Sequence, residues 1–359
     1  MNYVFNRPIS LALSGGGIRA IAYHLGVLKW LAERGLFENV TRISTVSGGS
    51  LLMGMVYQSA GFRWPRSEHF LSTSWPNITE QLCSKSLQMG ALGQLVWPPN
   101  WRFILSRANL VALELKQNWG FDVPMSVLQS GPEWSINGTT AQNGKRFRFK
   151  GTGIGDWDVG YAVAPDFPLS CALAVSAAFP IGIGPLTIDS KDFVWRRRDW
   201  NEPASAAKVV KLPYEKLHLY DGGLYDNLGT ESFFDVGRQV SKHPGDYIIV
   251  SDAGAPLTYG MTWGPLSLGR VKRMMDIMSE QTRSLRVRPF VTYLQNNNEG
   301  GAFFPIGFQV SGGECQEAQF ARTFPTSLKR FDRRDFERLT QYGYDVTVAV
   351  DKKHGVCRP

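Results

Sequence analysis

Short apolar runs alternate with longer helical patterns over the first sixty residues. Residues 9–14 and 41–46 are short runs with the composition of buried strands. Each is followed by a stretch in which apolar side chains recur around most of a helical wheel, at 19–34 and 47–59. A helix that is apolar on most sides belongs inside a protein, and Gly26 within the first one predicts close contact with a neighbouring element. The order strand, helix, strand, helix predicts a βαβ unit with parallel strands.

Further strands and helices follow in the middle of the chain. Residues 108–129 carry a helical pattern, and 134–149 predict a hairpin that turns at Asn143-Gly144. Residues 216–221 and 246–252 are runs typical of strands, and each ends in a carboxylate. The hairpin adds antiparallel strands to the parallel unit, so the pattern predicts an α/β protein with a mixed sheet.

The last third of the chain is mainly helical in pattern. Residues 267–286 predict a helix. Four apolar side chains in it recur at helical spacing: Val271, Met274, Met275 and Met278. Such a stripe usually packs on a core, so we expect it to face inward. From residue 331 onward the pattern predicts a charged helix and then a short strand at 346–350.

Two strand-to-helix turns carry residues suited to chemistry. At residues 14–19, Gly15, Gly16 and Gly17 let the backbone approach a bound group closely, and the helix that follows points its free N–H groups at that group. This turn predicts an anion cradle. At residues 45–49, Ser47 lies between a strand and an apolar helix, where a sharp turn exposes its hydroxyl at the helix N-terminus. A nucleophile beside an oxyanion cradle is the minimum that acyl transfer requires.

The nucleophile needs a base, and a third turn supplies a candidate. The strand predicted at 216–221 ends in Asp221, which Gly222 and Gly223 follow. Open α/β sheets gather functional groups at the carboxyl ends of their strands, so the fold can bring Asp221 to Ser47.

The three turns, in this order, resemble the patatin-like phospholipase family, whose members are lipid acyl hydrolases with a serine–aspartate dyad and no catalytic histidine. The similarity runs from about residue 8 to 230 and includes the small-residue block 176–180. It implies a three-layer α/β sandwich with a mainly parallel central sheet and helices on both faces. One departure is visible, because Thr45 stands where the family's elbow usually has glycine.

The resemblance also implies roles for individual residues and requires neither a metal nor an organic cofactor. Ser47 is implied as the nucleophile and Asp221 as the base. The implied oxyanion site consists of the Gly15, Gly16 and Gly17 amides with Arg19. The glycines that support the motifs are Gly48, Gly49, Gly222 and Gly223.

Other assignments of the base stay open. Asp252 also ends a predicted strand and is the main rival of Asp221. A histidine would complete a conventional serine triad. His24 lies one turn after the glycines and His218 three residues before Asp221, so both are candidates.

Two other functions compete with hydrolysis. The spacing Gly15, Gly17, Ala20 satisfies a loose dinucleotide-binding pattern, but the second strand lacks the acidic residue that would hold a ribose. A non-catalytic basic module that binds membranes is the second alternative. No motif concentrates the basic residues for nucleic-acid recognition, so we expect no nucleic-acid partner.

The stretch 61–107 supports an interaction with lipid. It is broken by prolines and combines arginines with Trp64, Trp75, Trp97 and Trp101. Indole rings beside arginine favour the membrane–water interface, whereas tryptophans packed on the core would give the same composition. Both interpretations stay open for this insertion.

Composition sets the remaining bounds. The 359 residues are 43% hydrophobic and 19% charged, which fits a globular protein with a large core. We expect one catalytic domain over 1–359, with an insertion at about 61–107 and a C-terminal extension from about 290. A net charge of +8 suits an anionic membrane surface. We read no secretory signal, so we expect a cytoplasmic, peripherally membrane-associated protein, with an activating partner or small signal as a further family expectation.

Overall fold

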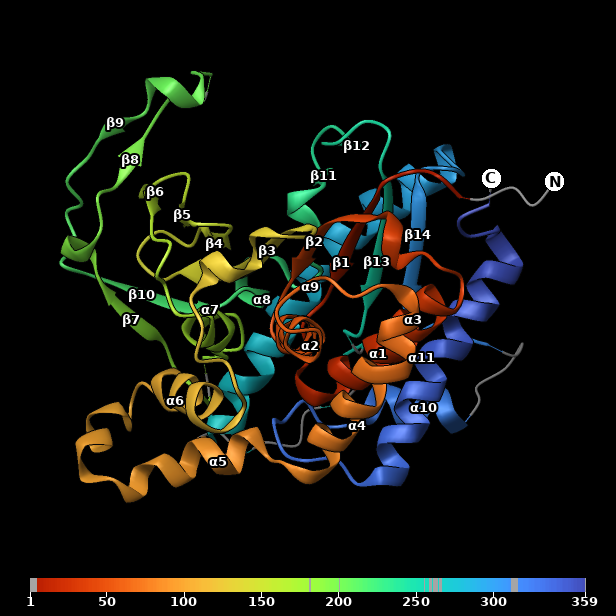
Figure 1. The fold of residues 1–359 in the computed structure, drawn as a ribbon, viewed down its shortest axis with the longest axis horizontal. Coiled ribbons are helices and arrows are strands. Elements are labelled where there is room, and N and C mark those ends of the chain that lie inside the picture. The colour runs from red at the N-terminus through yellow and green to blue at the C-terminus, as the bar shows by residue number, and fades with distance from the viewer. Residues whose placement is uncertain are drawn as a thin grey trace.

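The βαβ unit expected at the N-terminus is present in the computed structural model, which describes residues 5–358 apart from 181, 200, 255, 258–259, 261–263, 265–266 and 311–315. Strand β1 (Ile9–Leu13) leads through helix α1 (Gly17–Glu33) and the short 3₁₀ turn η1 (Phe37–Asn39) to β2 (Val40–Thr45) and α2 (Gly48–Ser59) (Figure 1). β1 and β2 pair in parallel, as predicted. The glycine turn and the serine elbow therefore lie at the same edge of the sheet.

The central strands of the sheet are parallel. Their order is β14-β13-β1-β2-β3, with β3 at Glu133–Thr140, β13 at Tyr247–Asp252 and β14 at Gly301–Pro305. The sheet continues in antiparallel pairs through β4 (Arg146–Lys150), β5 (Gly153–Asp156), β6 (Gly160–Val163), β8 (Arg196–Arg197) and β9 (Lys208–Val209). β3 and β4 form the hairpin predicted from the sequence.

Strand β10 (Lys216–Asp221) brings the third motif to the sheet. It pairs antiparallel with β3 and with β7 (Leu186–Asp189). A separate two-stranded ribbon, β11 (Phe234–Asp235) and β12 (Val240–Ser241), follows. Asp221 stands opposite Gly138 of β3, so β3 lies between the strand that carries Ser47 and the strand that carries Asp221.

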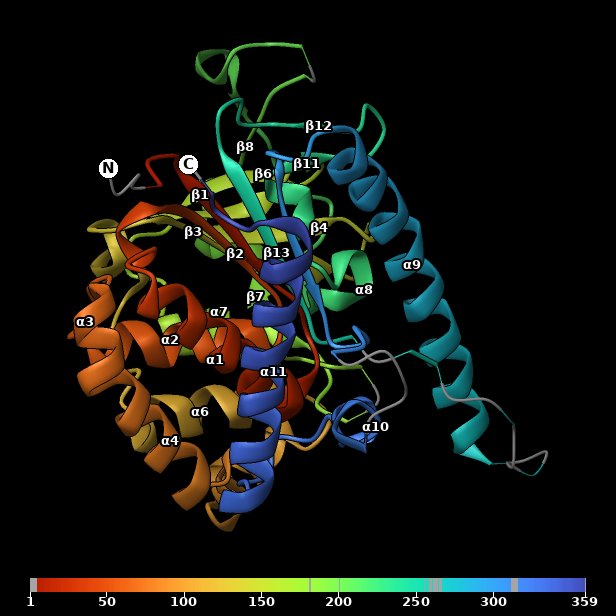
Figure 2. The same ribbon diagram turned by 90° about the vertical axis from the view of Figure 1, so that its right-hand side faces the viewer.

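Helices cover both faces of the sheet, and the strand residues divide between two cores. Leu11, Leu13 and Ile249 belong to the large core on the side of α1 and α2. Ala12, Ile248 and Val250 point the other way, into a smaller core that includes Phe290 of helix α9 (Leu268–Asn296). Figure 2 shows α9 on the opposite side of the sheet from α1. The three-layer arrangement expected from the sequence is confirmed.

Helix α11 (Arg333–His354) packs directly against α1. A Cβ atom on Gly26 of α1 would overlap the carbonyl of Thr340, and one on Gly343 of α11 would overlap the carbonyl of Tyr23. The two backbones therefore approach as closely as only glycine allows. This is the close contact that Gly26 predicted.

The remaining helices surround this core. Residues 61–107 contain α3 (Ser67–His69), the π turn η2 (Phe70–Ser74), α4 (Trp75–Ser84), α5 (Leu87–Gly93) and the 3₁₀ turns η3 (Gln94–Val96) and η4 (Pro98–Phe103). They are followed by α6 (Ala108–Asn118), η5 (Met125–Gln129), α7 (Leu169–Ser176), η6 (Ser190–Asp192), η7 (Ala204–Ala206), α8 (Gly223–Asp226), η8 (Thr230–Ser232) and α10 (Gln316–Thr323). The division into one catalytic domain with an insertion and a C-terminal extension stays a prediction.

Two local predictions were wrong. Residues 346–350 continue α11 instead of forming a strand. Their β-branched side chains fit the helix because Val346 and Val350 lie one turn apart and both are buried. The apolar stripe of α9 also does not face inward: Val271, Met274 and Met278 are exposed. The helix packs instead through its C-terminal half, where Phe290 is buried.

Within the described part of the chain, none of the helices combines the length and the apolarity that a bilayer span needs.

Candidate active site

Ser47 occupies a strained turn between β2 and α2. Its backbone has φ of 51° and ψ of −121°, a region that residues with a side chain rarely adopt. Strain of this kind is the mark of a nucleophile elbow, in which the serine side chain is presented at the tip of a sharp strand-to-helix turn. The residue lies at the N-terminus of α2, where the helix dipole favours negative charge.

Asp221 meets Ser47 from the end of β10. The Ser47 hydroxyl lies beside the Asp221 carboxylate, close enough to lower its pKa. The Gly223 N–H donates a hydrogen bond to Asp221 Oδ1 at 2.7 Å. Burial raises the pKa of Asp221 to about 7, although the Gly223 N–H and the Ser47 hydroxyl both oppose that rise. The structure therefore joins the two residues predicted as nucleophile and base; their catalytic roles stay a prediction.

The glycine turn lies beside the serine. Gly16 and Gly17 both have positive φ, 147° and 57°, and a Cβ on Gly15 would come within 3.1 Å of the Ser47 Cβ. The N–H groups of Gly16, Gly17 and Gly48 donate to none of the described residues. These three free donors near one hydroxyl form an electropositive site for an oxyanion.

Two members of the expected oxyanion site are engaged elsewhere. The Gly15 N–H already donates to the Asn227 carbonyl at 3.0 Å. The Arg19 side chain is buried and donates through Nη1 to the carbonyls of Phe324, at 3.2 Å, and Arg322, at 3.4 Å. Arg19 therefore fastens the segment after α10 to the glycine turn.

A chain of hydroxyl groups anchors the elbow from behind. The Ser47 N–H donates to Ser176 Oγ at 3.0 Å, and Ser176 Oγ bonds Ser50 Oγ at 2.8 Å. Ser50 Oγ bonds Thr45 Oγ1 at 2.7 Å, which accepts the Trp134 indole N–H at 2.8 Å. All five residues are buried. Thr45, the one departure from the family pattern, therefore supplies a hydroxyl that the turn uses.

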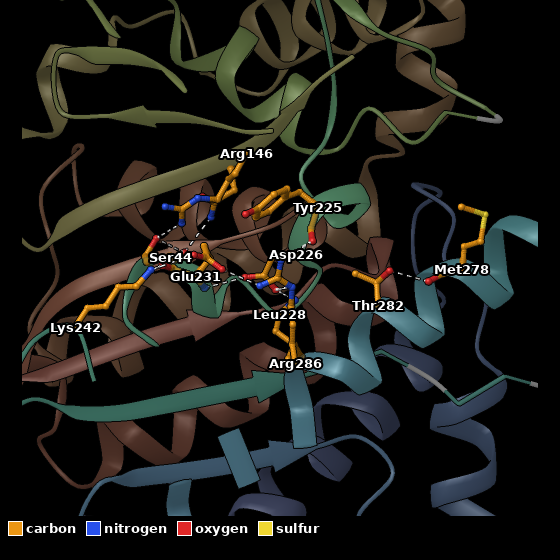
Figure 3. Close-up of polar contacts among 12 residues, drawn as sticks. Ser44, Arg146, Tyr225, Asp226, Leu228, Glu231, Lys242, Met278, Thr282 and Arg286 are labelled. Carbon is orange, nitrogen blue, oxygen red and sulfur yellow. Dashed lines mark hydrogen bonds and ion pairs between the residues drawn. The ribbon is translucent and has the colours of Figure 1, made fainter. Parts of the chain in front are cut away.

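A charged network holds the segment that follows Asp221. Arg286 of α9 lies between Asp226 and Glu231 and also donates to the Tyr225 carbonyl (Figure 3). The Glu231 carboxylate forms ion pairs with the Arg286 guanidinium, at 2.8 Å, and with the Lys242 ammonium, at 3.0 Å. The turn that carries the base is therefore tied to α9 on the outer face of the sheet.

The same segment is also tied to the strand of the nucleophile. Arg146 donates to Ser232 Oγ at 2.8 Å, and Ser232 Oγ lies 3.1 Å from Ser44 Oγ on β2 (Figure 3). Asn137 of β3 donates to Ser44 Oγ at 3.0 Å and to the Thr45 carbonyl at 2.9 Å. These bonds fix the ends of β2 and β10 relative to each other.

The rival bases have other partners. Asp252 pairs with Arg283 at 2.9 Å and accepts the Gly254 N–H; burial raises its pKa, which the charge of Arg283 opposes. His24 is buried between Ser251 Oγ, at 2.7 Å, and the Ser14 carbonyl, and burial lowers its pKa to about 4. His218 bonds Gln142 at 2.8 Å. Among the described residues, no histidine lines the cavity around Ser47.

A cavity of about 630 Å³ contains Ser47, Asp221 and the glycine turn, a volume usual for ligand pockets. Its lining includes an apolar group, which consists of Leu110 and Val111 of α6 with Phe179 and Ile183. The loop after α7 thus borders the cavity. A polar part of the lining comes from α9, through Lys272 and other charged residues.

Several residues of the site belong to none of the motifs recognised in the sequence. Ser176 lies in the small-residue block 176–180, and its hydroxyl at the start of that apolar block was the available clue. Asn227 and residues 322–328 line the cavity but belong to no motif. In the described part of the chain, no group of three or more histidine, cysteine or acidic side chains is arranged to hold a metal ion.

Comparisons with known proteins identify the family and the fold. A protein-family model described as patatin-like phospholipase matches residues 11–234. Human GIVD cytosolic phospholipase A2 has a similar fold, with a TM-score of 0.56 and 16% identity over 97% of this chain and 62% of that chain. Its complex with methyl gamma-linolenyl fluorophosphonate gives 0.54 and 15% over 98% of this chain and 58% of that chain. This chain therefore spans less than two thirds of these structures. A search of curated proteins found no match.

Proposed function

The chain belongs to the patatin-like phospholipase family, and on this basis we propose that it is a serine lipid acyl hydrolase that cleaves carboxylic ester bonds of membrane phospholipids. The observation that carries the proposal is that Ser47, on a strained elbow, shares a cavity with a buried Asp221 whose pKa burial raises to about 7. A carboxylate with this pKa is a far stronger base than an ordinary aspartate, and at neutral pH it also releases a proton readily.

The first half of the reaction forms an acyl-enzyme. Ser47 Oγ attacks the ester carbonyl carbon while its proton passes to Asp221. The resulting oxyanion accepts hydrogen bonds from the N–H groups of Gly16, Gly17 and Gly48. The Gly15 N–H does not contribute, because it already donates to the Asn227 carbonyl. Donors of this kind each lower the barrier by roughly 3 to 4 kcal/mol. Asp221 then protonates the leaving alkoxide, which departs as the lysophospholipid.

The second half restores the enzyme. A water molecule attacks the acyl-serine carbonyl and gives a proton to Asp221. The tetrahedral intermediate collapses, Ser47 takes the proton back, and the fatty acid leaves. We propose that the acyl chain lies along the apolar wall formed by Leu110, Val111, Phe179 and Ile183 and that the rest of the lipid extends toward α9.

We propose that the enzyme acts at a membrane surface as a peripheral protein. Its net charge of +8 favours anionic lipid. An activating partner or small signal is compatible with this mode of action, and the connection of α9 to the Asp221 turn through Arg286 gives such a signal a physical route to the site.

Product analysis tests the reaction class. The protein is incubated with phosphatidylcholine vesicles that contain phosphatidylglycerol, and the lipids are identified by mass spectrometry. We expect fatty acid and lysophospholipid in equal amounts. Diacylglycerol or phosphatidic acid as the product would show cleavage at the phosphate and contradict the proposal.

The hydroxyl chain behind the elbow makes a separate prediction. Ser176→Ala leaves the buried Ser47 N–H without its acceptor, which costs about 1 to 3 kcal/mol. We expect kcat to fall about tenfold with KM within about twofold, because the nucleophile is displaced while the acyl pocket is intact. Ser176→Thr keeps a hydroxyl and should restore most of the rate.

Ser170→Ala is the matched control, since Ser170 is a buried serine on the same helix that makes no bond to the elbow. Equal kcat values for Ser176→Ala and Ser170→Ala would show that the chain does not position the nucleophile.

A further inference from the structure

Helix α9 turns a charged face to the cavity and an apolar face to solvent, which is the reverse of an ordinary surface helix. Lys272, Asp276, Glu280 and Arg283 recur at helical spacing and line the cavity. Val271, Met274 and Met278 recur on the side away from the cavity and are exposed, Met278 by 66%. In Figure 3, Met278 lies apart from the charged network that Arg286 gathers on the same helix. An apolar face turned to solvent marks a surface that another body covers.

A second exposed apolar group lies in and after α5, a helix that also contributes to the lining of the cavity. We call it the α5 ridge, and it comprises Met89, Val96, Trp97, Trp101, Ile104 and Leu105. Leu105 is 90%, Val96 80% and Trp97 67% exposed. By contrast, Trp64 stacks on Phe37 with ring centroids 5.0 Å apart. The tryptophans of the insertion therefore divide, with some packed on the core and others presented at the surface.

The cavity reaches the surface between these two groups. Leu92 of α5 and Lys272 of α9 both line it, and both are exposed. Figure 1 shows α5 and the first turns of α9 toward the same, lower end of the molecule, and in Figure 2 these turns again lie low. The α5 ridge and the exposed face of α9, which we call the α9 ridge (Val271, Met274, Ile277 and Met278), therefore flank the mouth of the site.

The charges around the mouth decide what covers it. Residues 85–107 contain Lys85, Arg102 and Arg107 and no acidic residue. At the start of α9, Arg270, Lys272 and Arg273 come within four residues of one another, and of these Lys272 pairs with Asp276 at 2.6 Å. Exposed apolar side chains and indoles, surrounded by cations, complement an anionic bilayer, where the apolar groups enter the interface and the cations meet headgroup phosphates.

We infer that the two ridges together form a docking surface for an anionic lipid bilayer, with the mouth of the cavity pressed against it. The inference rests on the proposed function in one respect, because the lipid that enters the cavity from the bilayer is taken to be the phospholipid substrate. The lipid then passes from the bilayer to Ser47 between two apolar walls, and its acyl chain is never fully exposed to water.

Vesicle binding tests the surface directly. Ser47→Ala protein is sedimented with phosphatidylcholine vesicles containing 30% phosphatidylglycerol, so that hydrolysis does not alter the vesicles. We expect binding that weakens with added salt and on vesicles of phosphatidylcholine alone. Two double variants test the ridges, one with Trp97→Ala and Trp101→Ala and the other with Met274→Gln and Met278→Gln. Each should lower the partition coefficient for vesicles about tenfold. Because these side chains are exposed, circular dichroism should show unchanged folding.

The controls carry exposed apolar side chains elsewhere. Trp157→Ala matches the tryptophan pair, and Val348→Gln on α11 matches the helix pair; both positions are exposed. We expect both to bind vesicles as well as the parent protein. Equal binding by the ridge variants and these controls would overturn the inference, and so would failure of the parent protein to bind vesicles at low salt, which would leave the face for a protein partner.

Activity separates this inference from the proposed function. In the wild-type background, the ridge variants should lose vesicle hydrolysis in proportion to binding, while they cleave a water-soluble short-chain p-nitrophenyl ester at the normal rate. Loss of both activities in the ridge variants would contradict a docking role. Ridge-dependent binding by a wild-type protein that cleaves neither substrate would uphold the docking surface and overturn the proposed function.

Discussion

Ser47→Ala should abolish hydrolysis of phospholipid and of soluble esters, with kcat lowered by at least about 10⁴-fold. The hydroxyl is the atom that forms the acyl-enzyme, and it lies beside the buried Asp221 carboxylate. The alanine fits the strained elbow no worse than serine does, so folding is preserved. Steady-state kinetics on both substrates give the loss.

Labelling provides the second measurement for this variant. A fluorophosphonate probe forms a covalent bond with an activated serine, so mass spectrometry of wild-type protein should find the adduct on Ser47 and on no other residue. Labelling of a different serine, or activity that survives Ser47→Ala, would show that the nucleophile lies elsewhere.

Asp221→Asn should lower kcat by about 10⁴-fold, because the amide accepts no proton from Ser47. In the wild type, the raised pKa of about 7 sets the pH dependence of the reaction. The ionised carboxylate is the active form, so kcat/KM should be half-maximal near pH 7 and fall about tenfold per pH unit below it. A profile that is flat from pH 5 to 8 would exclude Asp221 as the base.

The same substitution should stabilise the fold at high pH. The folded-state pKa of Asp221 lies above the unfolded value of about 3.9, so folding binds a proton that the unfolded chain releases. The resulting stability is complete below about pH 4 and is lost as pH rises through 7. Asp221→Asn carries no charge, and at pH 8 it should exceed wild type by up to about 4 kcal/mol in the free energy of unfolding, with no such gain at pH 4.

Asp252→Asn is the matched control for this prediction. It also removes a buried carboxylate at a strand end, but that carboxylate pairs with Arg283. We expect it to destabilise the protein, because the partly buried Arg283 guanidinium loses the charge of Asp252 and keeps only its pair with Glu280, and to preserve the pH dependence of hydrolysis.

Local patterns predicted the elements that carry the site because each motif combines a strand, a turn and a helix in a few residues. β1, β2 and β10 begin or end within about two residues of the predicted runs. The rule that functional groups gather at the carboxyl ends of strands made a meeting of Ser47 and Asp221 possible, and the family resemblance implied it, because nothing in the spacing of the two residues fixes their distance.

Other parts of the structure depend on partners that are remote in sequence. Periodicity located the apolar stripe of α9 but not the side on which it lies, since a helical repeat is the same whether it meets a core or solvent. β-branched residues predicted a strand at 346–350, and packing against α1 overrode that preference. The bond from Trp134 to Thr45 joins strands β3 and β2, so the role of Thr45 could not be found in its own neighbourhood.

Because α1 packs on α11, the part of the chain that must fold to form the site is longer than the part that carries the catalytic motifs. Gly16 and Gly17 lead into α1, and α1 is held in place by Gly343 and its neighbours near the end of the chain. A fragment that stops at residue 234 would contain every motif residue, yet it would lack the middle strand β13, which lies directly beside β1, and the helix that covers α1. The catalytic residues thus lie in the first two thirds of this protein, but their site forms only after the last helix has packed in place.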